Sequence, residues 1–277
     1  MHDSELVYVS SSNKNLIYHY TTSDLAIAKI LKDGRLKFGL YKNMNDPFEF
    51  LHRQMEFSYC DDDLQRSHDV LDKMFIANRK WESLRELCFC CDDFEFSAKN
   101  NLSHPYNRGW ARSRMWSQYA DTHKGVCFVF DKDKLRKAIM DNLTPSTYQM
   151  LSDKVSYDDN LEEYHQINTV SEDEINNGSA LSNFFTDEKN RKYLFHKLKD
   201  YRDEQEYRFL IVDRGGKIDD EEYFVSIKES ICGIIVGCNF ECAYLQNIKQ
   251  YSGIYQIPAY WIKWDWDVPK LSRLFLY

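Results

Sequence analysis

One stretch organises this sequence: Asp203-Glu204-Gln205-Glu206-Tyr207-Arg208-Phe209-Leu210-Ile211-Val212, which begins polar and ends as an apolar run. Aromatic and β-branched residues dominate its second half, and Gly215-Gly216 follows, which is typical of a buried strand. Glu204 and Glu206 lie two residues apart, so strand alternation predicts that their side chains share one face. Open sheets place their chemistry at strand ends. The stretch therefore predicts a core strand with two carboxylates at its mouth, although glutamates in such a place are commonly just solvated.

The composition is that of an ordinary globular protein, apart from its aromatic content. The chain has 277 residues, of which 43% are hydrophobic and 29% charged. Because no clean break divides the sequence, we expect a single domain over 1–277, with helical or polar insertions near 50–85 and 140–182. The 19 Tyr, 17 Phe and 6 Trp fit either an aromatic core or a cleft that stacks planar ligands. The net charge of −8 excludes a global basic field, so any nucleic-acid contact needs a local basic patch.

The sequence shows no signal for export or membrane insertion. Met1-His2-Asp3-Ser4-Glu5 is acidic and no apolar segment of a secretory signal follows, and no apolar run is long enough to span a bilayer. We therefore expect a cytoplasmic protein without a membrane partner, whose eight cysteines are in a reducing compartment. Cys88-Phe89-Cys90-Cys91 and the Cys238/Cys242 pair lack the paired C-x2-C spacing of structural zinc sites. We expect buried free thiols there, and no metal.

The N-terminal part predicts a strand, a helix and a second strand. Residues 15–22 begin apolar and aromatic and end in hydroxyl residues, and Thr22 or Ser23 can cap the helix that follows. Gly34 is suited to end that helix, and the residues after it alternate like a strand. His19 lies near the end of the first strand. A lone histidine is more often structural than functional, and its threonine neighbours favour a functional role only modestly.

The middle of the chain predicts two further strands and a short helix. Residues 86–91 and 124–130 are apolar runs of strand length, and Asp131 is placed to cap the helix after the second of them. Between these strands, Trp116 and Tyr119 lie one turn apart on a short predicted helix.

The C-terminal part predicts a basic helix and then the remaining strands. Residues 183–203 have helical spacing, and 189–202 is the most basic segment of the chain. Such a charge run is usually a solvated helix face, and the alternative is a phosphate-binding face. A strand over 231–237, a helix over 243–250 and a final strand over 254–262 then close the predicted fold.

Several common catalytic motifs are absent. The sequence has no phosphate-binding loop of the Walker type, no G-x-G-x-x-G, no H-E-x-x-H and no G-x-S-x-G. A carboxylate nuclease would have a lysine two residues after the acid of its core strand, and the run Glu204-Gln205-Glu206-Tyr207-Arg208 has none.

Taken together, these pieces resemble an uncharacterised bacterial protein family with ordered landmarks. The landmarks are N-D-P-F-E, then M-W-S-x-Y-A-x-x-x-x-G-V-C, then E-x-E-Y-R and a hydrophobic residue. They stand here at 45–49, 115–127 and 204–210.

The same pattern resembles, more distantly, the ADP-ribosyltransferase superfamily. Members commonly begin with a strand bearing His or Arg and a helix ending in I-L-x-x-G-x-L, and here Tyr18-His19-Tyr20-Thr21 is followed by Ile30-Leu31-Lys32-Asp33-Gly34-Arg35-Leu36. A late strand in the superfamily starts with a catalytic glutamate. The resemblance implies an α+β fold with a split, mixed or antiparallel β-sheet core and flanking helices.

The resemblance also implies a site for NAD as substrate. Glu206 would be the catalytic acid and Glu204 would orient the acceptor. The cofactor-binding residues would be His19, Tyr20, Thr21, Arg35, Trp116 and Tyr119, with Trp116, Tyr119 and Phe89 as alternatives for stacking on nicotinamide. In the ADP-ribosyltransferase reaction positive charge builds on the ribose, which a carboxylate stabilises. Candidates for the pyrophosphate are Arg35, Arg108, Arg112 and Arg114.

The function implied is transfer of ADP-ribose to a macromolecule, protein or nucleic acid, by a bacterial toxin or anti-phage effector. A toxin of this class would have an antitoxin or other inhibitory partner, and RNA or DNA could bind through 189–202. Two alternatives stay open. One is a metal-dependent nuclease using Asp46, Glu49 and Glu206, and the other is a non-catalytic interaction module.

Overall fold

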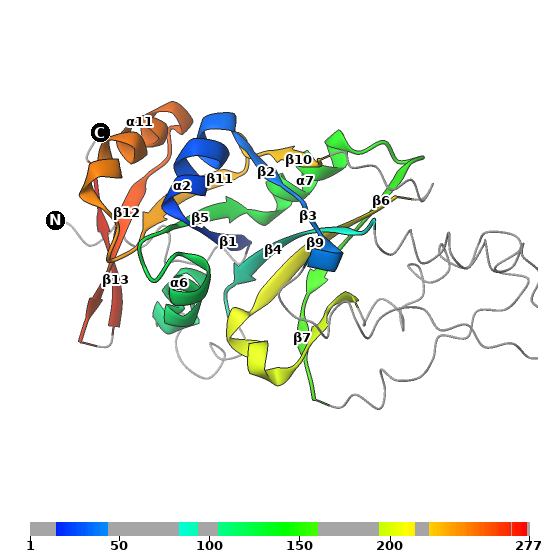
Figure 1. Cartoon of the computed structure of the whole chain (residues 1–277), viewed down its shortest axis with the longest axis horizontal. Coiled ribbons are helices and arrows are strands. Elements are labelled where there is room, and N and C mark those ends of the chain that lie inside the picture. Colours follow the sequence, from blue (N-terminus) through cyan, green and yellow to red (C-terminus); the bar gives the residue numbers. More distant parts are fainter. Residues whose placement is uncertain are drawn as a thin grey trace, which may run out of the picture.

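The computed structural model describes residues 15–43, 83–93, 105–159, 194–213, 222–266 and 268–275, and its centre is one large mixed β-sheet (Figure 1). The strand order is β13-β12-β11-β5-β1-β4-β9-β6, with β3 paired to β4. Neighbouring strands are antiparallel except β11 and β12, which are parallel. The strands are β1 (Leu16–Thr21), β3 (Gly39–Leu40), β4 (Arg85–Cys91), β5 (Val126–Asp131), β6 (Tyr148–Lys154), β9 (Glu206–Asp213), β11 (Ile231–Val236), β12 (Ala259–Asp265) and β13 (Val268–Arg273).

Two short strand pairs accompany the main sheet. In the first, β2 (Arg35–Lys37) pairs antiparallel with β10 (Phe224–Ser226). In the second, β7 (Ser156–Tyr157) pairs parallel with β8 (His196–Lys197). The second pair lies below β9 in Figure 1, close to the 3-10 helix η5 (Lys199–Glu204).

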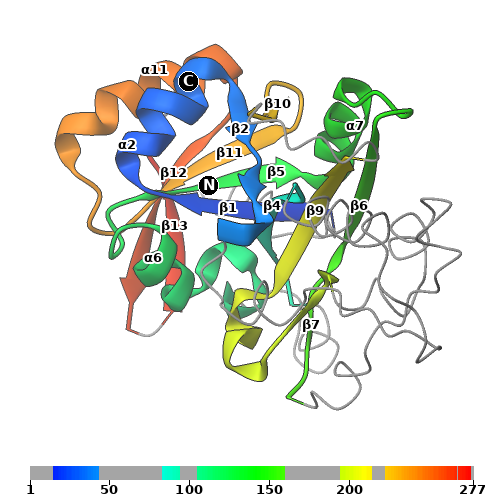
Figure 2. The ribbon, with the colours of Figure 1, turned by 45° about the vertical axis from the view of Figure 1, so that its right-hand side comes forward.

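Helices cover both faces of the main sheet (Figures 1 and 2). One face packs against α2 (Ser23–Leu25) and its π-helical continuation η1 (Ala26–Leu31), α7 (Lys132–Asn142) and α11 (Leu245–Tyr255). The other packs against α6 (Ser113–Tyr119) and η4 (Gly109–Ala111). The remaining short 3-10 helices are η2 (Tyr41–Asn43), η3 (Pro105–Asn107) and η6 (Cys242–Tyr244). None of the helices in the described ranges is long and apolar enough to cross a membrane.

Local sequence signals explain where several elements begin and end. Thr22 caps α2 through its side-chain oxygen, which accepts a hydrogen bond from the Leu25 amide. Gly34 has a φ of 66°, as a residue in the left-handed region after a helix requires. The side chain of Asp131 accepts bonds of 3.0 Å from the Asp133 and Lys134 amides at the start of α7. The predicted strand-helix-strand start and the capping by Asp131 are therefore confirmed.

The sheet narrows to two residue pairs at its middle. Strands β1 and β4 pair only at Ile17/Cys91 and Tyr18/Cys90, whereas β1 pairs with β5 along its whole length. Beyond Tyr18 the two strands separate. The Phe89 ring packs in the core beside this separation, with its centroid 5.7 Å from that of Phe130 on β5 and 5.8 Å from that of Phe209 on β9. A mixed sheet with flanking helices agrees with the expected α+β class, and this separation lies next to the candidate site.

The prediction of a basic helix over 189–202 was wrong for its described part. Residues 189–193 lie outside the described ranges, but 196–197 form strand β8 and 199–204 form η5. Lys197, which the helix prediction placed on a basic face, is buried. Tertiary contacts with two glutamates fix its conformation, and such contacts leave no trace in local sequence spacing.

The C-terminal boundaries and one strand also differ from expectation. The helix predicted over 243–250 continues to Tyr255, so the next strand begins at Ala259, and the strand β13 follows that was not predicted. Strand β6 lies within the range expected to be an insertion, 140–182. Both β6 and β13 are edge strands. Edge strands tolerate polar residues and proline, so their sequences are hard to distinguish from those of loops. Most of the expected 50–85 insertion and the N-D-P-F-E landmark lie outside the described residues.

Candidate functional site

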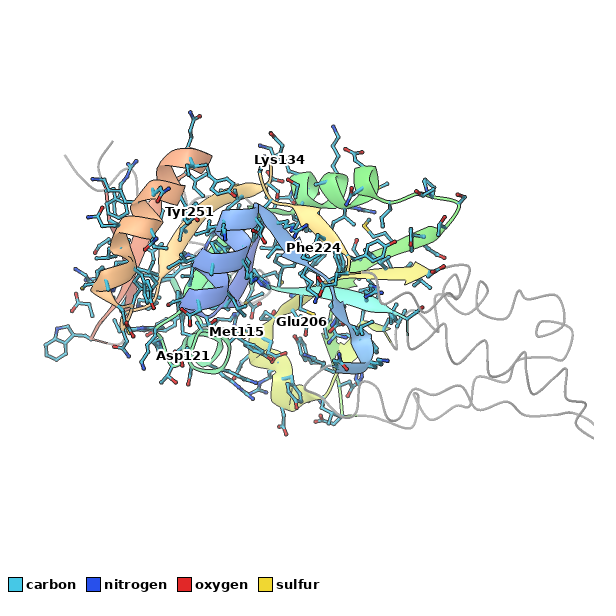
Figure 3. The ribbon with its side chains drawn as sticks, turned by 45° about the horizontal axis from the view of Figure 1, so that its top comes forward. Met115, Asp121, Lys134, Glu206, Phe224 and Tyr251 are labelled. Atoms are coloured by element: carbon cyan, nitrogen blue, oxygen red, sulfur yellow. The ribbon has the colours of Figure 1, made fainter. Side chains whose placement is uncertain are left out.

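A pocket of about 260 Å³ opens where β1 and β4 separate. Residues of β1, β4, α6, β8, η5 and β9 line it. In Figure 3, Met115 on α6 and Glu206 on β9 mark two of these walls. Five of the eight expected site residues are among the lining, although they lie far apart in sequence: His19, Tyr20, Tyr119, Glu204 and Glu206.

Glu206 is held by two cations. Its side chain lies beside Arg208 on the same face of β9, with Arg208 Nε 2.5 Å from Oε1 and Nη2 3.1 Å from Oε2. Lys197 Nζ lies 2.7 Å from Oε2. Burial raises the pKa of Glu206, but the charges of Arg208 and Lys197 outweigh burial and hold that pKa well below its ordinary value. Glu206 is therefore an ionised carboxylate at neutral pH.

Glu204 pairs with the same Lys197 ammonium group, but it lies in the 3-10 helix η5 rather than in strand β9. Lys197 Nζ lies 2.8 Å from Glu204 Oε2, and the Tyr119 hydroxyl donates a 2.6 Å bond to Oε1. Gln205 between the two glutamates has left-handed φ and ψ angles of 43° and 53°. The expectation that Glu204 and Glu206 share a strand face by alternation was therefore wrong, because Glu204 ends a 3-10 turn. Both carboxylates nevertheless line the pocket.

His19 presents a neutral imidazole to the pocket. Its Nδ1 lies 3.1 Å from the Cys88 carbonyl oxygen, which can only accept a hydrogen bond, so Nδ1 carries the proton. Burial lowers the pKa of His19 below its ordinary value of 6.5, against the opposing effect of that bond. At neutral pH the other ring nitrogen, Nε2, is therefore an acceptor.

Cys88 connects the histidine and glutamate sides of the pocket. Its carbonyl accepts from His19, and its side chain lines the same pocket as the carboxylate of Glu206. Burial and the charge of Glu206 raise the pKa of the Cys88 thiol well above its ordinary value, so the group stays protonated. His19, Cys88 and Glu206 therefore line the same cavity.

Three expected cofactor-binding residues lie outside the pocket lining. Thr21 is buried at the end of β1. Arg35 lies on β2 with its guanidinium 3.9 Å from the centre of the Phe224 ring. Trp116 is fully buried and donates from Nε1 to the Trp110 carbonyl at 2.8 Å, so Tyr119 is the aromatic residue of α6 in the pocket.

The arginines proposed for the pyrophosphate do not line the pocket either. Its lining cations, among the described residues, are Lys37 and Lys197. The other arginines pair with aspartates: Arg108 with Asp92 at 3.2 Å, Arg112 with Asp93 at 3.9 Å and Arg114 with Asp203 at 3.7 Å.

Two of the three residues of the nuclease alternative fall outside the part of the chain that the structure describes. Asp46 and Glu49 lie outside the described residues. Within the described ranges, no group of three or more His, Cys, Asp or Glu side chains is arranged to hold a metal ion. The seven cysteines there are free thiols, and Cys242 is exposed rather than buried as expected.

Sequence reasoning missed Lys197, Arg208 and Tyr157 as site residues. The Tyr157 hydroxyl accepts a 2.9 Å bond from the Glu206 amide and so fixes the start of β9. Arg208 could have been found, because it lies two residues after Glu206 and alternation places both on one face. Lys197 and Tyr157 gave no such signal, since they come from separate short strands.

Residues 115–209 match the model of a family described as a protein of unknown function, DUF2971. The matched range runs from α6 to β9 and contains Tyr119, Glu204 and Glu206, while β1 with His19 lies outside it. No curated protein and no solved structure matches the chain.

Proposed function

We propose that this protein is an NAD-dependent ADP-ribosyltransferase acting on a macromolecule. The observation that carries the proposal is that His19 and Glu206, which lie far apart in sequence, line one pocket. The pocket opens where β1, which carries His19, separates from β4, and β4 pairs in turn with β9, which begins at Glu206. The resemblance to the superfamily supplies the reaction, and the pocket supplies groups of the kinds this reaction needs.

The reaction breaks the bond between ribose C1′ and the nicotinamide nitrogen. The bonding electron pair leaves with nicotinamide, C1′ and the ring oxygen share the positive charge, and the acceptor then bonds to C1′ and loses a proton. An ionised carboxylate that accepts a hydrogen bond from a ribose hydroxyl stabilises this cation without forming a covalent bond. Glu206 suits this role because the two cations beside it keep it ionised, and of the about four hydrogen bonds that a carboxylate can accept, Arg208 and Lys197 use three.

The other lining groups suit the neutral parts of NAD. His19 Nε2 can accept from a ribose hydroxyl, and Tyr20 and Tyr119 offer aromatic surface for a planar ring. At about 260 Å³ the pocket is near the lower end of the range typical of ligand sites, roughly 300–1,000 Å³. It therefore fits the nicotinamide riboside portion better than the whole dinucleotide.

The biological setting follows from the same proposal. The enzyme would act in the cytoplasm as a toxin or anti-phage effector and would need an inhibitory partner. The acceptor would be a protein or a nucleic acid. Burial of Lys197 weakens the case for a nucleic-acid contact through 189–202, which favours a protein acceptor.

Labelled NAD tests the proposal. Purified protein is incubated with labelled NAD and cell extract, with and without a chelator, and nicotinamide release and label in the protein and nucleic-acid fractions are measured. We expect chelator-resistant transfer that falls about 10²–10³-fold in Glu206→Gln. Glu229→Gln, a substitution at an exposed glutamate, is the matched control.

Two outcomes would count against the proposal. Transfer that persists in Glu206→Gln would show that this carboxylate is not catalytic, and absence of NAD cleavage by wild-type protein in any extract would reject the activity. Because Glu206 is buried in ion pairs, His19→Gln provides a second variant that leaves these pairs intact, and a higher KM for NAD is expected. Chelator-sensitive cleavage of nucleic acid would instead support the nuclease alternative.

A further inference from the structure

A single buried ammonium group joins the two carboxylates of the pocket. Lys197 Nζ lies 2.8 Å from Glu204 Oε2 and 2.7 Å from Glu206 Oε2. All three side chains are at most 9% exposed. Both bonds have the lengths of charge-assisted hydrogen bonds, so one cation neutralises part of two anions at once.

The two glutamates depend on Lys197 to different degrees. Glu206 keeps a bidentate partner in Arg208 whatever happens at Lys197. Glu204 has Lys197 and the uncharged Tyr119 hydroxyl, and it makes no other ion pair within the described ranges. Two close, buried carboxylates without a cation between them cannot both stay ionised, and one of them takes up a proton.

We propose that Lys197 is a positioning residue that keeps Glu204 and Glu206 ionised together and fixes their spacing across the pocket. The catalytic part of this proposal rests on the proposed function, in which Glu206 stabilises the cation of the reaction and Glu204 orients the acceptor, both as carboxylates. Its electrostatic part concerns the protein alone. In this role Lys197 makes the charge of the site insensitive to pH over the physiological range.

Other charged or titratable groups surround the pair and are unchanged by substitution of Lys197. They include Tyr18, His19 and Tyr20 on β1, Lys37 on β2, Glu86, Cys88 and Cys90 on β4, Tyr119 on α6, Asp153 and Lys154 on β6, Tyr157 on β7, Tyr201 on η5 and Arg208 on β9. Arg208 contacts Glu206, and its guanidinium also donates to the Leu194 carbonyl at 3.1 Å. None of these groups bridges both carboxylates among the contacts of the described residues, so Lys197 is the element to change.

The first test measures protonation without any assay of activity. Glutamate labelled with carbon-13 at the side-chain carboxyl is incorporated, and chemical shifts are followed by NMR between about pH 5 and pH 8. We expect one additional titrating carboxyl in Lys197→Met relative to wild type. It should disappear in Lys197→Met/Glu204→Gln, which removes the facing charge, and in Lys197→Arg, which restores a cation.

The second test measures transfer of labelled ADP-ribose to the acceptor over the same pH range, because Glu204, which loses its cationic partner in Lys197→Met, is the residue expected to orient the acceptor. Wild type and Lys197→Arg should give a flat profile, whereas the rate of Lys197→Met should fall about tenfold per pH unit below its protonation step. Lys199→Met is the matched control, because Lys199 lies two residues away, is exposed and pairs with Asp158 and Asp159. Its profile should stay flat.

The outcomes separate this proposal from the proposed function. Absence of NAD cleavage in wild type rejects the transferase activity, but the NMR titration still decides the role of Lys197. Transfer with a flat profile and no new titrating carboxyl in Lys197→Met overturns the role of Lys197 and leaves the activity standing. If Lys197→Met does not fold, folding of Lys197→Met/Glu204→Gln supports the charge bridge, and failure of both variants shows that Lys197 serves packing instead.

Discussion

Replacement of Gly125 by alanine should destabilise the protein through backbone contacts beside the pocket. Gly125 lies between α6 and β5, in the M-W-S-x-Y-A-x-x-x-x-G-V-C landmark. A Cβ atom there would lie 2.2 Å from the Thr21 carbonyl oxygen and 2.8 Å from the Ala120 Cα. Both neighbours are backbone, and the Gly125 amide donates to the Ala120 carbonyl at 2.8 Å while its own carbonyl accepts from Gly237 at 2.9 Å. The backbone at Gly125 therefore cannot move to make room for a Cβ atom without loss of these two hydrogen bonds.

The size of the effect follows from these contacts. Overpacking in a well-packed site costs about 1–3 kcal/mol, and a clash with backbone on two sides belongs at the upper end of that range. We expect Gly125→Ala to lower the free energy of unfolding by about 3 kcal/mol. For a domain of this size each kcal/mol corresponds to about 2–4 °C in Tm, so the midpoint should fall by roughly 6–12 °C.

Gly253→Ala is the matched control. Gly253 lies in α11 and is exposed, and no heavy atom lies within 4 Å of a Cβ built there. Alanine is the better helix former, so this variant should gain up to about 1 kcal/mol. Thermal unfolding followed by circular dichroism gives both midpoints. A Gly125→Ala midpoint equal to that of wild type would refute the reasoning, as would an equal loss in both variants.

Three further predictions concern the pocket. Burial raises the pKa of Glu206, but its cationic partners outweigh burial and hold that pKa below 4.5. Glu206 therefore adds stability above about pH 4.5, and this stability is lost as the pH falls below that value. Acid unfolding should be less steep in Glu206→Gln. Arg208→Met should cost about 3–5 kcal/mol in urea unfolding, because it leaves a buried carboxylate without its bidentate partner, and the loss should shrink when Glu206→Gln is added. Nitrogen-15 NMR should show His19 neutral at pH 7 with the proton on Nδ1, and a protonated imidazole would contradict the bond to Cys88.

The parts of the fold that sequence predicted are those fixed by local signals. Strand β9 was found because its apolar run is continuous, and the start of α7 because Asp131 precedes it as a cap. Strand β13 was missed because Pro269 and its alternating polar residues suit an edge strand as well as a loop. Gln205 in the left-handed region gave no sequence warning that Glu204 would end a turn.

The site was predicted in part for the same reason. His19 and Glu206 are each the polar residue near the end of an apolar strand, which sequence shows. Lys197 reached the pocket through pairing of β7 with β8, a contact between segments about 40 residues apart. Arg35 and Trp116 were expected at the site by resemblance, and the first is held by an aromatic ring elsewhere while the second is needed in the core.

The aromatic ring of Phe89 affects the size of the pocket. In the rest of the main sheet, backbone hydrogen bonds fix the distance between neighbouring strands, so side-chain substitutions change that distance little. Beyond Tyr18, β1 and β4 make no further ladder pairs, and the Phe89 ring packs there against Phe130 and Phe209, with His19 at 5.5 Å. Phe89 both lines the pocket and belongs to the core, so leucine at this position should enlarge the cavity, whereas tryptophan would overpack the core beside it.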